Sequence, residues 1–468
     1  MMNNKCISGF HRISILLLSL QLLFFNVLFA QDWQDLFNGR DLSNWERKNG
    51  TAEYRIEGEE VVGVSRLNTG GNSFLCTKDT YGDFILEFDV KVDPGLNSGV
   101  QIRSISDPEY NKGQVHGYQV EIDPSERAWS AGIYEEGRRG WLYPLTRNHK
   151  GREAFKNGVW NHFRVEAIGM HIRTWINGVQ CSNLADDMTA EGFIALQVHG
   201  IWSEEQEGLT VRWKNIRIIT ENPEAYQTQC DPEVPEISWL MNKLTTNEKR
   251  KGWRLLWDGE STEGWRRSND DHFPGSGWVI DDGILTIEES TGNEPDHGGD
   301  IITEQEFSSF ELELDYRITK GANSGIKYFV VENNEHKPGS GIGLEYQILD
   351  DEVNSDAKAG VNGNRTAGSL YDLIAAENLS EAPGSGKRDN GPGEWNKARL
   401  VVKGNHVEHW QNNLKIVEYE RGSQIYRNLV AKSKYAKYPG FGEAPTGHIL
   451  LQDHGNRVSF RSIKIREL

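Results

Sequence analysis

The chain has 468 residues, which is too long for one ordinary hydrophobic core and predicts two domains. Tryptophan and tyrosine number 15 each and glycine 49, a composition that suits short strands joined by tight turns. The net charge of −18 would repel a polyanion, and no basic block offsets it, which argues against nucleic-acid binding.

The N-terminal segment has the features of a signal peptide. Lys5 and Arg12 precede an apolar run at 13–30, and polar residues follow it. We expect cleavage after Ala30 and export to a bacterial periplasm; a retained membrane anchor is the alternative. No later segment of the sequence is long and apolar enough to span a bilayer.

Three cysteines remain after removal of that segment: Cys76, Cys181 and Cys230. Because three is an odd number, at least one thiol is unpaired, and no disulfide framework is expected. Their scatter along the sequence also argues against a thiolate metal site.

The rest of the sequence contains two related halves. Residues 83–104 align with 309–330, 117–123 with 345–351, 132–136 with 369–373, 160–179 with 395–414, and 195–200 with 450–455. The offset between matched residues grows from 226 at Asn97 to 235 at Trp160 and 255 at His199. Matched strands separated by loops of unequal length are the pattern of a duplicated domain.

Most of the matched segments alternate apolar and polar residues with period two, as at 310–318 and 406–414. That pattern indicates strands with one buried face, and helical periodicity is scarce. The expected fold class is all-β, with two tandem jelly-roll β-sandwiches. We expect them at 32–220 and 253–468, joined by a Pro- and Glu-rich linker at 221–252 with one short helix in its second half.

Polar residues recur at aligned positions in both copies: Gln119 and Gln347, Tyr134 and Tyr371, Gln197 and Gln452, His199 and His454. Period two places each Gln-x-His pair on one strand face. Neighbouring strands add Gln101, Arg103, Glu121 and Asp123 in the first copy, and Lys327 and Glu345 in the second. We expect each set to line a polar concave surface with a His, a carboxylate and a cation; ordinary solvent-facing strand positions are the alternative.

The acidic run Glu121, Asp123 and Glu126 allows a second interpretation, the carboxylate pair of a retaining β-glucanase, which needs two carboxyl groups about 5 Å apart. Pro124 is expected to end the strand, so Glu126 would lie in a turn and not beside Glu121. The second copy lacks two of the three acids, so a chance match is favoured.

Several motifs resemble a known family. These are NSGVQIRS (97–104), GYQVEIDPSERAWSAGIYEEGRRGWLYP (117–144), FIALQVHGIW (193–202), GLEYQILDD (343–351), KGNHVEHWQNN (403–413) and GHILLQDHG (447–455). They resemble two branches of the 3-keto-disaccharide hydrolase family, also described as 3-keto-glucoside 1,2-lyase/3-keto-2-hydroxyglucal hydratase domains. The resemblance implies a concanavalin A-like jelly roll that cleaves glycosides whose C3 hydroxyl is already a ketone, or hydrates the resulting glycal. A separate sugar 3-oxidoreductase is then expected as a pathway partner, since no nicotinamide-binding Gly-x-Gly-x-x-Gly fingerprint is present.

A ketone at C3 makes the hydrogen on C2 acidic. Such chemistry needs a base to remove that hydrogen, a group that stabilises the enolate oxygen and a proton donor for the leaving group. In the second copy Glu345 and His454 are the candidate base and acid, in either order, and Lys327 would polarise the ketone. The corresponding residues of the first copy are Glu121, Asp123 and His199, with Arg103 as the cation. The candidate substrate-binding residues are Gln101, Arg103, Gln119, Tyr134, Arg138, Arg139, Trp141, Gln197, Gln347, Arg365, Tyr371 and Gln452.

A divalent metal ion could be held by His199 with Glu121 or Asp123, or by His454 with Glu345, although no compact metal motif is present. It would be one way to stabilise an enolate. A non-catalytic carbohydrate-binding protein is the alternative from another class, because jelly rolls host lectins as readily as enzymes.

Two further features bear on how the copies differ. His297 and Asp300 precede a strand of the second copy and have no counterpart in the first, which indicates that the two copies are not equivalent in chemistry. Trp175 and Trp410 recur at one strand position in both copies, and a repeated strand tryptophan is expected to be a core residue.

Overall fold

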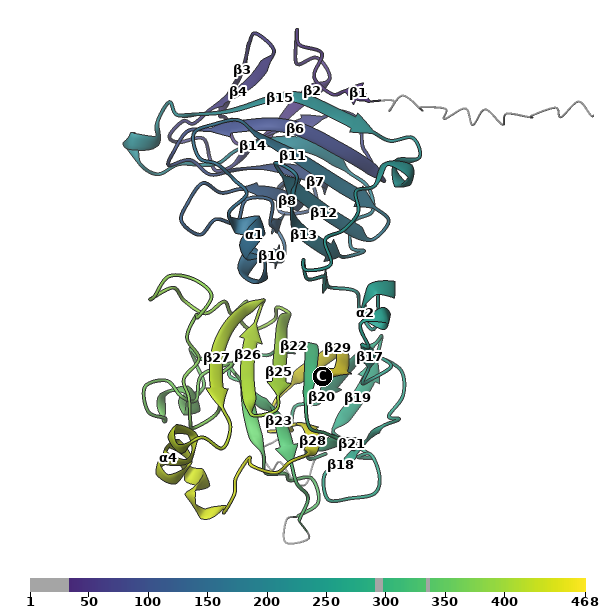
Figure 1. Ribbon diagram of the computed structural model, residues 1–468, viewed down its shortest axis with the longest axis vertical. Helices are drawn as coiled ribbons and strands as arrows, with labels where there is room; N and C mark the ends of the chain where they lie inside the picture. Colours follow the sequence, from purple (N-terminus) through teal and green to yellow (C-terminus); the bar gives the residue numbers. More distant parts are fainter. Residues whose placement is uncertain (1–32, 291–297, 334–336) are drawn as a thin grey trace, which may run out of the picture.

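The computed structural model describes residues 33–290, 298–333 and 337–468. The predicted signal peptide, 1–30, and His297 lie outside these ranges. Within them the chain forms two β-sandwiches that follow one another along the long axis of the molecule (Figure 1). The all-β prediction with two tandem jelly-roll sandwiches is confirmed.

The first sandwich consists of a larger and a smaller sheet. The larger sheet contains, in spatial order, β16 (Ile237–Ser238), β13 (Val179–Ala185), β12 (His171–Ile176), β11 (Asn161–Ile168), β6 (Phe84–Val92), β15 (Thr210–Ile219), β4 (Glu60–Val64) and β3 (Glu53–Glu57), with β1 (Gln34–Asp35) paired to β15. The smaller sheet contains β10 (Gly140–Tyr143), β9 (Ile133–Glu136), β8 (His116–Ile122), β7 (Ser98–Ile105), β14 (Phe193–Val198), β5 (Ser73–Thr77) and β2 (Trp45–Asn49).

The second sandwich has the same construction. Its larger sheet contains β19 (Trp278–Asp281), β20 (Ile284–Ile287), β29 (Val458–Glu467), β22 (Phe310–Ile318), β25 (Asn396–Lys403), β26 (His406–Gln411) and β27 (Leu414–Glu420), with β17 (Arg254–Leu255) paired to β29. Its smaller sheet contains β18 (Trp265–Arg267), β21 (Ile301–Phe307), β28 (Gly447–Leu451), β23 (Asn323–Val330) and β24 (Leu344–Leu349). The strand order β8-β7-β14-β5-β2 thus repeats as β24-β23-β28-β21-β18, which shows that the sequence repeat is a structural duplication.

Helices are short and lie outside the sheets. They are α1 (His149–Arg152), α2 (Thr246–Arg250) and α4 (Gln424–Lys432), with 3-10 turns at Leu145–Arg147, Glu204–Gln206, Pro223–Tyr226, Ser355–Lys358 and Lys434–Lys437. Within the described ranges, no helix combines the length and the apolar character needed to cross a membrane. The three cysteines predicted to lack a disulfide framework are all free in the structure.

The core of each sandwich lies between its two sheets, and strand alternation sends polar residues to the outer face of the smaller sheet. On β7, Val100 and Ile102 are fully buried in the main hydrophobic cluster, so Gln101 between them faces the opposite side. On β23, Ile326 and Tyr328 belong to the core in the same way and flank Lys327. The outer face of each smaller sheet therefore carries the polar side chains predicted for the concave surfaces.

The linker is attached to both sandwiches. Strand β16 pairs in parallel with β13 of the first sandwich, so the helix predicted in this part of the chain is limited to α2. Thr245 and Glu248 form a capping box at the start of α2, and Glu248 also accepts from Lys464 Nζ of the second sandwich at 2.5 Å.

Direct contacts also join the two sandwiches. Thr146 Oγ1 of the first donates to Asn413 O of the second at 2.7 Å. The Arg388 guanidinium of the second sandwich lies 4.3 and 5.4 Å from the ring centroids of Trp129 and Trp141 of the first. Cation–π contacts of this kind help to hold the two sandwiches together.

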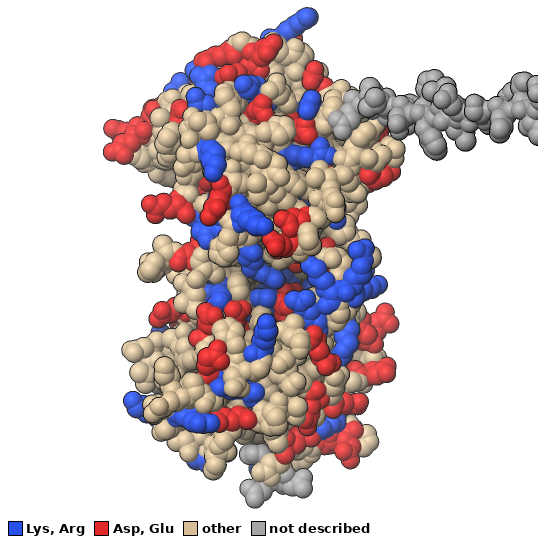
Figure 2. Space-filling view, in the orientation of Figure 1, with Lys and Arg blue, Asp and Glu red and all other residues tan. Residues whose placement is uncertain are grey.

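Cations near this boundary are paired with carboxylates. Figure 2 shows Lys and Arg side chains gathered across the middle of the drawn face, with acidic side chains beside them. Lys397 Nζ lies 2.7 Å from Asp315 Oδ1, and Lys464 Nζ lies 2.9 Å from Glu313 Oε2. Lys397 and Lys464, which are both buried, therefore serve internal ion pairs.

Candidate active site

The register of the central strands defines which residues of the two copies are equivalent. Gly99 on β7 lies opposite Glu121 on β8, whereas Gly325 on β23 lies opposite Gln347 on β24. Since Gly99 and Gly325 match in sequence, Glu121 corresponds to Gln347. The sequence alignment that superposed the two Tyr-Gln dipeptides is therefore wrong by two residues, a shift that keeps each side chain on its face.

With this register, the equivalent positions on the polar face are Gln101 and Lys327, Gln119 and Glu345, Gln197 and Gln452, and Phe74 and Asp300. The second copy has three charged side chains where the first copy has two amides and an aromatic ring. The two copies therefore differ in charge at three equivalent positions on the polar face of the smaller sheet, which agrees with the predicted difference in chemistry.

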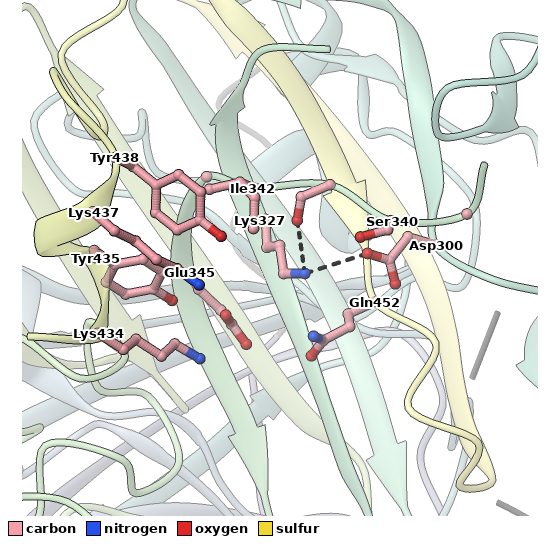
Figure 3. A pocket seen from close by; sticks show the side chains of 13 residues that line it. Asp300, Lys327, Ser340, Ile342, Glu345, Lys434, Tyr435, Lys437, Tyr438 and Gln452 are labelled. Atoms are coloured by element: carbon pink, nitrogen blue, oxygen red, sulfur yellow. Dashed lines mark hydrogen bonds and ion pairs between the residues drawn. The ribbon is translucent and has the colours of Figure 1, made fainter. Parts of the chain in front are cut away.

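The three charged side chains border a pocket of about 320 Å³ in the second sandwich (Figure 3). It is lined by Asp300, Lys327, Glu345 and Gln452 from the sheet, by the loop 339–343 between β23 and β24, and by Lys434, Tyr435, Lys437 and Tyr438. A cavity of this size suits one sugar ring with part of its substituent.

The Lys327 ammonium is held by protein acceptors. Lys327 Nζ donates to Asp300 Oδ2 at 3.2 Å and to Gly341 O at 3.0 Å. In the amide orientation that pairs donors with acceptors, it also donates to Gln452 Oε1 at 3.1 Å. An ammonium has three N–H groups, so the geometry does not support the predicted contact of Lys327 with a ketone. Its charge instead stabilises the neighbouring carboxylates.

Glu345 is the carboxylate at the centre of the pocket. It lies directly opposite Lys327 in the strand pair and is only 6% exposed. Burial raises the pKa of Glu345 above the ordinary value. The charges of Lys327 and Lys434 oppose that rise, and His454 lies close enough to act in the same sense. The structure thus brings Lys327 and Glu345 together at the wall of one pocket.

A glycine on the adjacent strand makes room for the Glu345 side chain. A Cβ atom at Gly325 would lie 2.5 Å from Glu345 Oε1. With its amide oriented to match its neighbours, Gln347 donates to Glu345 Oε1 at 3.1 Å and to Ser324 O at 3.0 Å. This explains the glycine of the repeated Asn-Ser-Gly motif, because it leaves room for a long polar side chain from the adjacent strand.

The segment between β27 and β28, residues 421–446, forms a pocket wall that the sequence interpretation missed. The Lys434 ammonium lies 4.1 Å from the ring centroid of Tyr371, and burial lowers the pKa of Lys434. Tyr435 lies beside it on the pocket side (Figure 3). The corresponding segment of the first copy is only 186–192. The growth of the alignment offset from 235 to 255 was the available signal, because it marks this insertion.

In the first sandwich the equivalent face carries a buried amide network. Gln101 Nε2 and Gln197 Nε2 both donate to Gln119 Oε1, at 2.5 and 2.8 Å. Gln119 Nε2 in turn donates to Glu121 Oε2 at 2.8 Å, and Asn97 Nδ2 donates to Glu121 Oε1 at 2.7 Å. Burial raises the pKa of Glu121 to about 7. The predicted residues Gln101, Gln119, Glu121 and Gln197 do converge, but their polar groups hydrogen-bond to one another.

The same face ends in an aromatic and basic cluster. Arg127 Nε donates to Asp123 Oδ2 at 2.8 Å, and the Arg127 guanidinium lies 4.9 Å from the ring centroid of Trp141. Trp141 packs edge-on against Tyr134 at 5.4 Å. Although burial acts in the opposite direction, a hydrogen bond from Ser125 and the charge of Arg127 lower the pKa of Asp123. Asp123 is a paired carboxylate and not a free base.

The prediction that Arg103 supplies the cation of the first site is wrong. Arg103 follows Ile102 at a break in the register of β7 and has a φ of 44°. Its guanidinium donates to the carbonyl oxygens of Gly82 and Gly169, each at 2.8 Å, and to Asp83 Oδ1 at 2.8 Å. The break in the strand directs the side chain to these groups, which period-two alternation could not reveal.

Arg138 and Arg139 pair with carboxylates of the protein, so the prediction that they bind substrate is also wrong. Arg138 Nη2 lies 2.7 Å from Glu135 Oε1 and donates to Thr189 Oγ1 at 2.7 Å. Arg139 pairs with Glu135 and, at 2.7 Å, with Asp186 Oδ2. Glu135 is fully buried, so the two arginines neutralise internal carboxylates.

The two predicted histidines have different surroundings. His199 Nδ1 lies 2.7 Å from Gly200 O, and the His199 ring packs edge-on against Trp202 at 5.8 Å. Burial lowers the pKa of His199. The contacts that the structure gives His199 are therefore with its own loop.

Arg365 and Tyr371 support the pocket wall from behind. Arg365 lies 2.9 Å from Asp356 Oδ1 and 2.8 Å from Asp372 Oδ1. Tyr371 Oη donates to Asp356 Oδ2 at 2.7 Å while its ring faces the Lys434 ammonium. These residues, predicted to bind substrate, position Lys434 instead.

Among the described residues, one group of His and acidic side chains brings its ligand atoms close enough to share a metal: His406, Glu408 and Glu418. Lys415 Nζ lies 2.8 Å from Glu408 Oε1 and 3.2 Å from Glu418 Oε2, so an ammonium already neutralises these carboxylates. The sets predicted around His199 and His454 do not form such a group in this part of the chain.

A buried carboxylate among lysine and tyrosine side chains, in the hollow of a jelly roll, is an arrangement suited to a glycosidase-type enzyme. Sequence comparison identifies the family. The chain belongs to the 3-keto-alpha-glucoside-1,2-lyase-like domain family, which matches residues 32–219 and 252–466.

The chain is also similar to individual proteins. The 3-keto-disaccharide hydrolase of Bacteroides thetaiotaomicron is 35% identical over 248 residues, which cover 49% of this chain and 82% of that protein. A candidate glycosyl hydrolase from Parabacteroides distasonis ATCC 8503 is 30% identical and has a TM-score of 0.42, with coverage of 49% of this chain and all of that one. The carbohydrate-binding module CBM66 of Bacillus subtilis is 19% identical, with a TM-score of 0.26 and coverage of 37% of this chain and 93% of that one.

We predict that Gly325→Ala displaces the Glu345 carboxylate and lowers turnover without unfolding the protein. The new methyl group meets the end of a flexible side chain, and Gly325 does not have a positive φ, so the backbone is not strained. Gly275→Ala, which meets nothing within 4 Å, is the matched control. Turnover and melting temperature are measured for both, and an active Gly325→Ala protein would contradict the placement of Glu345.

We also predict that Glu121→Gln makes folding stability less sensitive to rising pH. Because burial raises the pKa of Glu121 from 4.5 to about 7, its ionisation opposes folding. The stability associated with the neutral carboxyl is fully present below pH 4.5 and is lost as the pH rises through about 7. By pH 8 the wild-type protein should have lost about 3 kcal/mol that the variant keeps. Urea unfolding at about pH 5 and about pH 8 measures this, with the exposed Glu126→Gln as control; equal pH dependence in all three proteins would refute the shift.

Proposed function

We propose that the second sandwich cleaves 3-keto-glycosides by β-elimination across C1 and C2 of the oxidised sugar. The observation that carries this proposal is the buried Glu345 carboxylate, which has a raised pKa and borders an open pocket of about 320 Å³. The family description and the name of the Bacteroides relative, which both refer to 3-keto sugars, support the substrate class.

The proposed reaction needs only acid–base groups. The C3 ketone acidifies the C2 hydrogen, so Glu345 can remove that proton as a carboxylate. The C1–O bond to the aglycone then breaks and a C1=C2 double bond forms. The departing oxygen takes up a proton, and the products are a 3-keto-2-hydroxyglucal and the free aglycone.

Lys434 is the proposed stabiliser of the enolate oxygen. Its ammonium contacts the face of Tyr371 and lies on the same side of the pocket as the Glu345 carboxylate (Figure 3). A cation held in a partly dehydrated pocket stabilises a developing negative charge more strongly than one in water. Tyr435 and Tyr438 offer ring faces and hydroxyl groups to the pyranose.

His454, two residues after the pocket residue Gln452, is the proposed proton donor to the leaving oxygen. Net hydrolysis would follow by addition of water to the same glycal. In that step the proton on Glu345 returns to C2, the hydroxyl group of water bonds to C1, and the other proton of the water passes to His454, which gave up its own proton to the aglycone. The sugar product is then the free 3-keto sugar.

The substrate implies a pathway partner and a location. Oxidation of the C3 hydroxyl must precede this reaction, so we infer that a separate sugar 3-oxidoreductase supplies the substrate. Export directed by residues 1–30 would give the enzyme access to sugars outside the cytoplasm.

We predict that Glu345→Gln lowers kcat on a chromogenic 3-keto-glucoside by roughly 10²–10⁴-fold, the usual contribution of a general base. Both anomers and the matching unoxidised glucosides are assayed in parallel. Glu121→Gln, the same change in the first sandwich, should retain turnover within a few-fold. Full activity of Glu345→Gln would reject the proposed base, and binding without turnover by the wild-type protein would favour a purely carbohydrate-binding role.

We predict that Lys434→Met shifts the acidic limb of the pH profile upward. Glu345 must be ionised to act, and burial raises its pKa, so kcat/KM of the wild-type protein should fall at acidic pH with a midpoint above 4.5. Removal of the Lys434 charge removes an influence that lowers this pKa, so the midpoint should move to higher pH. Lys437→Met, in the same pocket wall, is the control. An unchanged midpoint in Lys434→Met would show that the titrating base is not coupled to Lys434.

A further inference from the structure

A second hollow, in the first sandwich, is not explained by the proposed catalysis. It has a volume of about 460 Å³ and lies between the segment before β5 and the loop that joins β7 to β8. Its side chains include Asn72, Phe74, Asn111, Lys112, Gln114 and Glu136. The catalytic pocket of the second sandwich is formed by the equivalent segments, Asp300 before β21 and the loop between β23 and β24.

The two hollows differ in charge. The catalytic pocket is lined by three lysines, an aspartate and a glutamate, whereas the hollow of the first sandwich has one lysine, one glutamate and several amides. Phe74 takes the position of Asp300, and Gln101 and Gln119 take the positions of Lys327 and Glu345 on the sheet. The first hollow therefore has hydrogen-bonding groups and an aromatic floor without the charged set that the proposed elimination needs.

A neighbouring hollow of about 350 Å³ extends this surface. It shares Thr69, Gly70 and Gly71 with the first one and ends at Trp202. Trp202 is 82% exposed, and its indole packs edge-on against His199 at 5.8 Å. An indole held in place but left open to solvent is a surface on which a flat apolar face can dock.

Asn72 joins the two hollows. Asn72 Oδ1 accepts from Gly200 N at 3.0 Å beside the Trp202 loop, and Asn72 Nδ2 donates to Glu136 Oε1 at 3.3 Å in the first hollow. The walls of both hollows are thus fixed to each other before any ligand arrives. A preorganised polar surface loses less conformational entropy on binding than a mobile one.

We propose that the first sandwich binds a neutral saccharide along these two hollows, with Trp202 against one sugar face and the amide side chains on the hydroxyl groups, and does not cleave it. A pyranose has both an apolar face and a ring of neutral hydroxyls, which matches this lining. An anionic ligand would meet Glu136, and a purely apolar one would leave the amides without partners. The site is separate from the proposed catalytic pocket and does not depend on it.

Calorimetric titration of the full protein with maltotriose, cellotriose and laminaritriose tests this proposal. We expect saturable binding of at least one of them, weakened at least about tenfold by Trp202→Ala and measurably by Lys112→Met. Both residues are exposed, so the variants should fold. Val361→Ala, an exposed apolar residue of the second sandwich, is the control and should bind as the wild-type protein does.

The outcomes separate this site from the catalytic one. Binding that persists in Glu345→Gln and is lost in Trp202→Ala supports the proposal, whatever the result of the turnover assay. Binding that is lost in Glu345→Gln and unchanged in Trp202→Ala would place the saccharide in the catalytic pocket and overturn it. Absence of saturable binding of all three trisaccharides up to roughly 10 mM, the range of very weak affinity, would also overturn it.

Discussion

The structure depends on the burial of opposite charges side by side on one face of a β-sheet. Asp300, Lys327 and Glu345 are 4, 8 and 6% exposed. Removal of an ion from water costs on the order of several kcal/mol, so such charges persist only when they are paired and hydrogen-bonded. Gln452 bridges Lys327 and Glu345, and Lys434 adds a second cation. The result is a group of charges that is nearly balanced overall but keeps one carboxylate at the wall of an open pocket.

In the first sandwich, amide side chains take the positions that charged side chains hold in the second. Its smaller sheet has the same strand order, and a Cβ at Gly99 would meet the Gln119 side chain as one at Gly325 would meet Glu345. Amides replace the charges, and Glu121 is moved along the strand and enclosed. The duplicated scaffold therefore accommodates two kinds of polar network on one backbone geometry.

Strand alternation and the internal repeat were sufficient to predict the two sandwiches, and alternation placed Lys327 and Glu345 on one face. Three features could not be predicted in this way. The register of β24 was hidden because Tyr-Gln occurs in both copies but two residues out of step. Arg103 was misplaced because a break in β7 redirects its side chain. Arg138 and Arg139 were assigned to substrate binding because the turn that folds them back onto Glu135, and the distant Asp186 that Arg139 meets, could not be read from strand alternation.

The insertion at 421–446 shapes one wall of the pocket, while the smaller sheet and the loop 339–343 supply the rest. Glu345 stands on a strand, where its position is fixed by the sheet, whereas Lys434, Tyr435 and Tyr438 stand on a segment that is much shorter in the first copy. Changes in the length or sequence of that segment can alter the shape of the pocket while the strands remain as they are. The outline of the binding space can therefore be remodelled through one surface excursion, without any change to the strands of either sandwich.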